Sequence, residues 1–225
     1  MKIGIIGAGQ LGRMLALAGY PLGVEFMFLD PGADAPGSHV GPILQGDFGD
    51  AAALAELAKQ VDLVTFDVEN VPVDAIRAIA RLKPFLPPPD ALGTSQDRLA
   101  EKTLFRALKI PTPAFQAVDS LSDLKKAVAL VGLPGVLKTR RLGYDGRGQF
   151  RLQSEADVAV AWAELGQVPL IYEAFVNFSR EVSIIGVRST RGEIAIYPLA
   201  ANTHERGILR HSTAPYRHEG LQKQA

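Results

Sequence analysis

The chain has 225 residues, 47% apolar and 21% charged, a balance typical of a globular protein with one or two domains. Its 24 basic and 24 acidic residues cancel, which disfavours a nucleic-acid partner bound through its phosphates. The absence of cysteine excludes disulfides, thiolate metal sites and a cysteine nucleophile. With no targeting sequence at the N-terminus and no apolar stretch of membrane-spanning length, we expect a soluble, cytoplasmic protein.

The first third of the chain alternates strands and helices. Strands are predicted at 2–6, 24–29, 43–44 and 62–66, and helices at 10–19, 50–60 (with Asp50 as N-cap) and 73–82, while the Gly- and Pro-rich stretch 31–42 is a loop. This order predicts an α/β fold, with a parallel sheet covered by helices.

A different pattern follows the proline-rich segment 84–89, which we interpret as the exit from the first domain. One helix is expected over 91–108 and an extended crossing at 110–113. Helices are then predicted at 120–131, capped by Ser120, and at 154–165, with strands at 135–138, 149–152 and 169–175 and a hairpin over 181–199 that turns at 190–192. This part predicts an α+β module with an antiparallel sheet. Residues 204–225 are polar and without apolar periodicity, so we expect no closing strand or helix there and a chain that stops inside a domain.

The turn after the first strand carries Gly7, Gly9 and Gly12 in the spacing G-x-G-x-x-G, and a helix follows it. Such a turn admits a phosphate to the N-terminus of the helix. Asp30 lies 18 residues after Gly12, at the end of the second strand, where dinucleotide-binding folds carry an acid for the ribose. Taken alone, the pattern indicates NAD. A tight turn that binds no dinucleotide is an equally good interpretation.

The strongest local signal is Lys138 followed by a Gly-rich loop, Gly143-Tyr144-Asp145-Gly146-Arg147-Gly148-Gln149, with Arg140 and Arg141 beside it. Glycines let a loop fold over phosphates, and basic side chains neutralise their charge. The loop lacks the P-loop pattern. A hairpin loop that happens to be rich in glycine is the alternative.

Other candidate polar residues are less specific. Glu69 follows the fourth strand, at the sheet edge where ligands bind in open parallel sheets, but could equally be a solvated acid. Glu173 and Glu181 lie at strand ends and suit ribose hydroxyls, although each could be a surface acid. His204 and His211 lack a second ligand at metal spacing, so without further context they are interpreted as ordinary polar residues.

Several motifs together resemble the N5-carboxyaminoimidazole ribonucleotide synthetases, a family of ATP-grasp ligases. They are G-A-G-Q-L-G-R-M at 7–14, E-N-V-P at 69–72, Asp97-Arg98 with Lys102, K-T-R-R-L-G-Y-D-G-R-G-Q at 138–149, E-A-F-V-N-F-S-R-E-V-S at 173–183 and Y-P-L-A-A-N-T-H-E-R-G-I-L-R at 197–210. The motifs occur in the family's order over nearly the whole chain.

The resemblance implies a Rossmann-like substrate-binding domain at 1–90, a small ATP-grasp lobe with a linker helix at 91–175, and the start of an incomplete large lobe at 176–225. It also implies ATP and Mg²⁺ as cofactors, with the metal ligands outside this chain, and a homodimer. The implied reaction joins bicarbonate to 5-aminoimidazole ribonucleotide through carboxyphosphate, in purine biosynthesis. The chain's expected partners are therefore small-molecule substrates, with neither nucleic acid nor membrane among them.

The resemblance also implies residue roles. Arg98, Lys138 and Arg147 would meet ATP phosphates under the loop Gly143–Gln149. The adenine and ribose of ATP would contact Glu173, Ala174, Phe175, Val176, Glu181 and His204. Contacts to the aminoimidazole ribonucleotide would come from Gln10, Leu11 and Glu69, with Tyr144 and Asp145 reaching across. Catalytic roles would fall on Lys138, Tyr144, Asp145 and Arg147.

The sequence departs from the family at Asp67, where a glutamate is expected, and in lacking the rest of the large lobe. Two other classes therefore stay open. An NAD-dependent oxidoreductase is favoured by the glycine turn and Asp30, but the α/β pattern stops near residue 84. The third class is a nucleotide-binding fragment that is inactive on its own.

Overall fold

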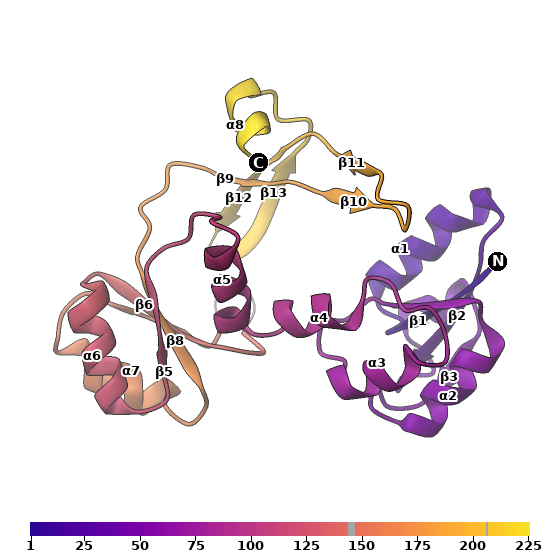
Figure 1. The fold of residues 1–225 in the computed structure, drawn as a ribbon, viewed down its shortest axis with the longest axis horizontal. Coiled ribbons are helices and arrows are strands. Elements are labelled where there is room, and N and C mark those ends of the chain that lie inside the picture. The colour runs from indigo at the N-terminus through magenta and orange to yellow at the C-terminus, as the bar shows by residue number, and fades with distance from the viewer. Residues whose placement is uncertain (144–146, 206) are drawn as a thin grey trace. The chain divides into compact units, whose positions relative to one another are not determined.

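The computed structural model describes residues 1–143, 147–205 and 207–225. The chain forms two compact units, Met1–Thr112 and Pro113–Ala225. Figure 1 shows the helices and strands of both. Each unit is described by itself below.

The first unit is built on a parallel sheet, as the alternating pattern predicts. Its strands are β1 (Lys2–Ile6), β2 (Glu25–Asp30), β3 (Ile43–Gln45) and β4 (Leu63–Phe66), arranged in the order β3-β2-β1-β4 with every pairing parallel. Successive side chains of a strand point to opposite faces of the sheet. Ile5 accordingly packs with Phe28 in one apolar cluster, and Ile6 packs with Leu29 in another.

Helices cover both faces of this sheet. Its helical elements are α1 (Gln10–Gly19), α2 (Ala51–Gln60), α3 (Val73–Ile79) and the short 3₁₀ turns η1 (Tyr20–Leu22) and η2 (Pro36–His39). Ala16 of α1 joins the Ile5 cluster, while Leu57 of α2 and Ile76 of α3 join the Ile6 cluster. Asp50 caps α2 as predicted, because its side chain accepts hydrogen bonds from the amides of the next turn.

The single helix expected over 91–108 is wrong. The structure has two helices there, α4 (Pro89–Ser95) and α5 (Arg98–Ala107). Asp97 lies between them, and its Oδ1 accepts hydrogen bonds from the amides of Leu99 (2.9 Å) and Ala100 (3.3 Å). Aspartate competes with helical backbone in this way, which favours the start of a new helix over continuation. Arg98 is consequently the first residue of α5.

The second unit begins with an antiparallel sheet, which confirms the predicted α+β module. Its strands are β5 (Phe115–Val118), β6 (Gly135–Thr139), β7 (Gln149–Leu152) and β8 (Leu170–Ala174), in the order β5-β8-β6-β7. Helices α6 (Leu121–Val131) and α7 (Asp157–Leu165) pack on one face, where Leu124 and Ala161 join Leu137 and Tyr172 in the core. Strand β5 was not predicted, since the prolines just before it suggest only an extended crossing.

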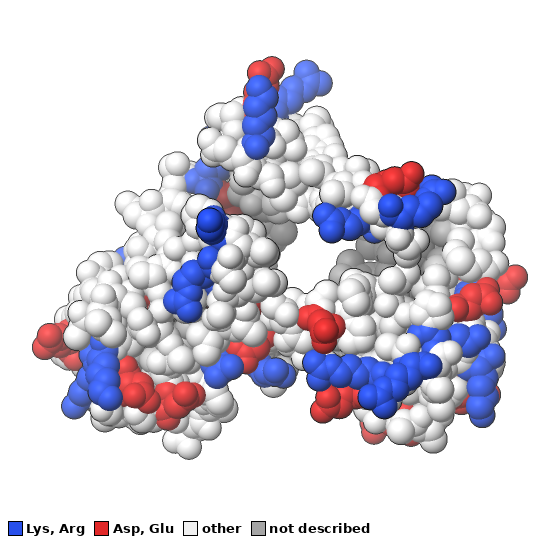
Figure 2. Space-filling model, in the orientation of Figure 1, with Lys and Arg blue, Asp and Glu red and all other residues white. Residues whose placement is uncertain are grey.

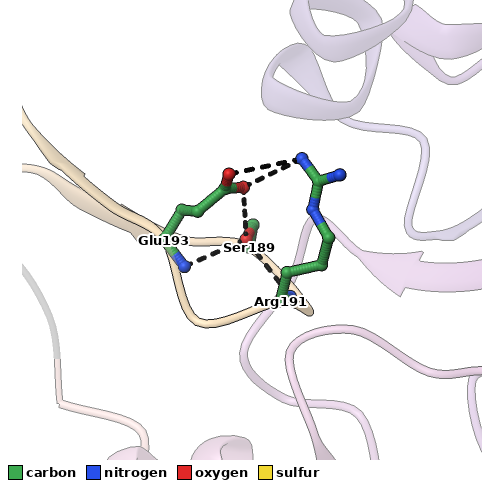
Figure 3. Close-up of polar contacts among 3 residues, drawn as sticks. All are labelled: Ser189, Arg191 and Glu193. Carbon is green, nitrogen blue, oxygen red and sulfur yellow. Dashed lines mark hydrogen bonds and ion pairs between the residues drawn. The ribbon is translucent and has the colours of Figure 1, made fainter.

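A hairpin and a three-stranded sheet follow. The hairpin pairs β10 (Gly186–Arg188) with β11 (Ile194–Ile196), and the sheet has the order β13-β12-β9, from β9 (Glu181–Ser183), β12 (Ala200–Glu205) and β13 (Ile208–Thr213). The predicted turn at 190–192 is present, with Gly192 at φ +90°. In Figure 3, Ser189 and Arg191 both contact Glu193 across this turn, the guanidinium lying 3.1 Å from the carboxylate.

Two expectations for this region are wrong. The continuous strand predicted over 181–189 is divided into β9, which pairs with β12, and β10, which pairs with β11. The polar end of the chain contains β13 and helix α8 (Glu219–Gln224) instead of no regular structure. All six residues of β13 are exposed, so its sequence has no apolar alternation to detect. Polar contacts join these strands, since Asn202 bonds both Ser183 (3.0 Å) and Ser212 (2.7 Å).

No helix within the described ranges is long and apolar enough to cross a membrane. Figure 2 shows both acidic and basic side chains on the visible surface of the chain.

Candidate nucleotide and substrate sites

The glycine turn of the first unit is closed by a carboxylate of the protein itself. Gly7 has φ +94° and donates its amide hydrogen to Leu29 O at 2.8 Å, which sets the tight turn after β1. Oδ2 of Asp67, just beyond β4, accepts a hydrogen bond of 2.7 Å from the amide of Gly12 in the first turn of α1. A Cβ on Gly12 would lie only 2.7 Å from that oxygen. Asp67 therefore lies close to the amides that a phosphate would use in a dinucleotide fold.

Asp30 is also used within the turn. Its Oδ2 accepts a hydrogen bond of 2.8 Å from the amide of buried Ala8, and its Oδ1 accepts one of 2.8 Å from the amide of Gly32. Each oxygen thus has a backbone partner within the first unit. The carboxylate that the sequence suggests for a ribose serves to hold the glycine turn in place, which favours the turn without a dinucleotide.

The predicted ribonucleotide contacts lie at the carboxyl edge of the parallel sheet. Gln10 and Leu11 begin α1, both exposed, and Leu11 lines a hollow of about 340 Å³ together with Asp67. Glu69 is exposed in the loop after β4. Gln96 of the same unit donates to the carbonyls of Glu69 (2.5 Å) and Val71 (2.7 Å) and so anchors this loop. Glu69 is not among the residues that line the hollow.

Lys138 and Glu173 form an ion pair in the second unit. Lys138 Nζ lies 2.9 Å from Glu173 Oε2, and the two side chains are 26% and 5% exposed. Lys138 is on β6 and Glu173 on the adjacent strand β8. The pairing places two residues that sequence analysis selected independently, 35 positions apart, in direct contact.

The residues after Glu173 lead out of the same sheet at the C-terminal end of β8. Ala174 and Phe175 are partly buried and Val176 is exposed. The guanidinium carbon of Arg151, on β7, lies 3.8 Å from the centre of the Phe175 ring. Cationic and aromatic groups attract at this distance. Sequence analysis missed Arg151, because nothing in its local pattern links it to Phe175.

Glu181 and His204 form a second pair within this unit. His204 Nδ1 lies 3.3 Å from Glu181 Oε2, and the side chains are 31% and 46% exposed. Glu181 starts β9 and His204 is near the end of β12, which pair through the register of Asn202 with Glu181. The structure thus brings together Glu181, predicted to hold the ribose, and His204, predicted to contact the nucleotide. His211, on β13, stands opposite Thr203 in the register.

The Gly-rich loop connects β6 and β7. Thr139 donates its amide hydrogen to Gly148 O at 2.8 Å, and Lys138 stands opposite Gln149 in the sheet register. Gly148 has φ +67°, and a Cβ on it would lie 2.6 Å from the Thr139 hydroxyl, so the close of this loop requires glycine. Gly143 and Arg147 flank the centre of the loop. The predicted residues Tyr144, Asp145 and Gly146 lie outside the described residues.

Arg98 belongs to the first unit, as the first residue of α5, and is described only there. Among the residues that the structure describes, no three His, Cys, Asp or Glu side chains form a group that could hold a metal ion.

Comparison with known proteins links this geometry to a family. The ATP-grasp domain model matches residues 103–225, and the ribonucleotide synthetase preATP-grasp domain model matches residues 1–96. The chain is 52% identical over 218 residues to an N5-carboxyaminoimidazole ribonucleotide synthase of Pseudomonas aeruginosa, covering 97% of this chain and 61% of the relative. It is 46% identical over 216 residues to the synthase of Brucella melitensis, covering 95% of this chain and 60% of that protein.

Solved structures give the same result. The synthetase from Thermus thermophilus is 50% identical with a TM-score of 0.92, covering 99% of this chain and 61% of that one. A synthase from Aspergillus clavatus, solved with ADP and 5-aminoimidazole ribonucleotide, is 28% identical with a TM-score of 0.90, covering 100% of this chain and 60% of that one. This chain therefore spans about 60% of the length of these relatives and belongs to the ATP-grasp family, with a ribonucleotide synthetase preATP-grasp domain before the ATP-grasp domain.

Proposed function

We propose that this chain supplies the ribonucleotide-binding domain and part of the ATP site of an enzyme that carboxylates 5-aminoimidazole ribonucleotide. The products are N5-carboxyaminoimidazole ribonucleotide, ADP and phosphate, and the pathway is purine biosynthesis. The observation that carries this proposal is the 52% identity, over 97% of the chain, to a synthase named for that product.

The chemistry has two steps. An oxygen of bicarbonate attacks the γ-phosphorus of ATP, ADP leaves, and carboxyphosphate forms. The 5-amino nitrogen of the ribonucleotide then bonds to the carboxyl carbon, or to the carbon dioxide that carboxyphosphate releases, as phosphate departs and the amine loses a proton. Neither step requires a covalent bond to the protein. The side chains act by positioning the reactants and neutralising charge.

The nucleotide is assigned to the following residues of this chain. Lys138, with Arg98 and Arg147, meets the phosphates, and the loop Gly143–Gln149 covers them. The C-terminal end of β8 with the two residues after it, 173–176, borders adenine. The pair of Glu181 and His204, 3.3 Å apart, meets the ribose side of the nucleotide.

The ribonucleotide is assigned to the first unit. Gln10, Leu11 and Glu69 bind it at the carboxyl edge of the parallel sheet, where ligands of such sheets bind. Tyr144 and Asp145 are also assigned to the ribonucleotide. The anchoring of the Glu69 loop by Gln96 supports this role, because a fixed loop holds a carboxylate in place for its ligand.

Further properties complete the proposal. The functional division is a substrate-binding domain at 1–90, a small lobe with its linker helix at 91–175, and the start of a large lobe at 176–225. The enzyme is a cytoplasmic homodimer that uses Mg²⁺ with ATP, and its metal ligands come from outside this chain.

Isothermal titration of the chain tests the nucleotide assignment. We expect binding of a non-hydrolysable ATP analogue and of ADP, and no binding of NAD. Lys138→Ala should lower the affinity for the analogue by about a hundredfold, since it removes a charged donor to the phosphates. Lys126→Ala is the matched control, because Lys126 is 71% exposed on α6. Micromolar NAD binding, or equal effects of the two variants, would contradict the assignment.

Titration with the aminoimidazole ribonucleotide tests the substrate. Glu69→Gln should weaken binding of the ribonucleotide and leave the affinity for the ATP analogue unchanged. Asp74→Asn, at a fully exposed carboxylate of α3, should change neither. A Glu69→Gln effect confined to the ATP analogue would refute the assignment of this residue.

A further inference from the structure

The ion pair of Lys138 and Glu173 has a definite place in the antiparallel sheet. Glu173 stands directly opposite Val136 in the pairing of β6 with β8, and Lys138 is two residues beyond Val136. Opposite residues share a face of the sheet, and so do residues two apart along a strand. Glu173 and Lys138 therefore lie diagonally on one face. The other face carries Leu137 and Tyr172, which pack in the core under α6 and α7.

Burial differs between the two charged groups. The Glu173 side chain is 5% exposed, whereas Lys138 is 26% exposed, so the carboxylate is the fixed partner and the ammonium is the one that solvent and ligands can reach. A lysine side chain has four rotatable bonds and loses much conformational freedom when it binds a ligand. A buried carboxylate 2.9 Å away removes part of that freedom in advance.

The hydrogen-bonding capacity of the ammonium is compatible with a ligand as well. An ammonium group has three donor hydrogens. One is directed at Glu173 Oε2, which leaves two for the oxygens of a phosphate. The carboxylate also offsets the cost of keeping a charged lysine partly out of water before the nucleotide binds.

We propose that Glu173 is a positioning residue that holds the ammonium of Lys138 for the phosphates of the nucleotide, and that its carboxylate does not select adenine. This inference rests on the proposed function, because it assigns a role within the same ATP site. The carboxylate acts through Lys138. Contact with adenine is left to the backbone of 173–176.

The proposal predicts which ligands are affected when Glu173 is changed. Glu173→Gln should lower the affinity for ATP and for ADP by about ten- to a hundredfold, the range expected when a charge-assisted hydrogen bond is lost. Adenosine has no phosphate, so its dissociation constant should stay within about twofold of the original value. Glu164→Gln, the same substitution at an exposed position of α7, should change none of the three.

A double-mutant cycle with ATP alone tests the route through Lys138. If Glu173 acts through Lys138, Glu173→Gln combined with Lys138→Met should bind ATP no more weakly than Lys138→Met alone. Glu173→Asp keeps a buried negative charge but is one methylene shorter, so it should lose ATP and ADP affinity in the same way. Glu173→Asp replaces Glu173→Gln in the test if the glutamine variant does not fold. Thermal unfolding of each variant establishes which variants are folded.

Three results are distinguishable. A chain that binds no ATP refutes the proposed function itself. If Glu173→Gln weakens adenosine as much as ATP, the carboxylate recognises adenine and the positioning role is wrong. If the effects of Glu173→Gln and Lys138→Met on ATP simply add, the two side chains act separately, and the positioning role is again wrong.

Discussion

Replacing Asp30 by alanine tests whether this carboxylate stabilises the glycine turn or binds a ligand. The substitution removes two hydrogen bonds, from the amides of Ala8 and Gly32, both 2.8 Å long. Ala8 is completely buried, so its amide loses its acceptor without water to replace it. An unsatisfied buried donor costs about 1–3 kcal/mol, while the more exposed Gly32 amide can turn to water. We expect Asp30→Ala to lower the free energy of unfolding of the first unit by about 2 kcal/mol.

The assay must separate the two units. Trp162, the chain's one tryptophan, is in α7, so its fluorescence follows the second unit, whereas far-UV circular dichroism follows both. In urea titrations the Asp30→Ala transition should shift in dichroism and stay in place in fluorescence. Hydrogen exchange of the Ala8 amide should speed up, and Asp30→Asn, which keeps one acceptor oxygen, should cost about half as much as Asp30→Ala.

Asp34→Ala is the matched control, at an exposed acid of the following loop, and should change stability by less than about 0.5 kcal/mol. Asp30→Ala as stable as the control would refute the structural role of the carboxylate. Micromolar NAD binding that disappears in Asp30→Ala would establish the ligand role instead.

Two further predictions concern pH. The backbone amides of Gln153 and Ser154 lower the pKa of Asp157 below its usual 3.8. The stability that these hydrogen bonds add is therefore present above pH 3.8 and is lost as pH falls through the lowered pKa. In urea titrations, Asp157→Asn should be less stable than the original chain at about pH 6 and equally stable in strong acid. Burial raises the pKa of Tyr172 above 10.0, so the unfolded chain loses this proton first and the free energy of unfolding falls as pH rises past 10. Tyr172→Phe should remove that fall, and it should cost about 1 kcal/mol at pH 7 because the 2.9 Å hydrogen bond to Gly132 O is lost. Tyr197→Phe, at an exposed ring, should have neither effect.

Local signals explain which parts of the fold could be predicted. The caps Asp50 and Ser120 act on amides two or three residues away, and the structure shows both as predicted. The turn at 190–192 depends on the φ of Gly192 and on contacts within five residues. Interactions of this range are encoded in neighbouring residues, so a single sequence is enough to find them.

The parts that were missed depend on distant residues. Asp67 reaches the amide of Gly12 across 55 positions, and Arg151 reaches the ring of Phe175 from another strand. Strand β13 is exposed throughout and β12 is exposed over its second half, so neither shows the alternation that reveals a half-buried strand. Polar contacts such as that of Ser212 with Asn202 join them. The contacts of Lys138 with Glu173 and of Glu181 with His204 also join residues that are distant in the sequence, so they could not be derived from spacing alone.

The division between α4 and α5 leads to a last prediction. A local signal was present in the sequence, since aspartate is a common N-cap, but one continuous helix was expected over 91–108. Asp97 is 7% exposed, and its Oδ1 accepts from the amides of Leu99 and Ala100. If this cap is what starts α5, Asp97→Ala should cost about 1–2 kcal/mol in urea unfolding followed by dichroism, and Asp97→Asn, whose amide oxygen still accepts, should cost much less. Asp90→Ala, at an exposed acid of α4, should stay within about 0.5 kcal/mol. Equal losses for Asp97→Asn and Asp97→Ala would show that the charge of Asp97, and not its place as a cap, stabilises this point of the chain. The helix that begins with Arg98 would then owe its start to another cause.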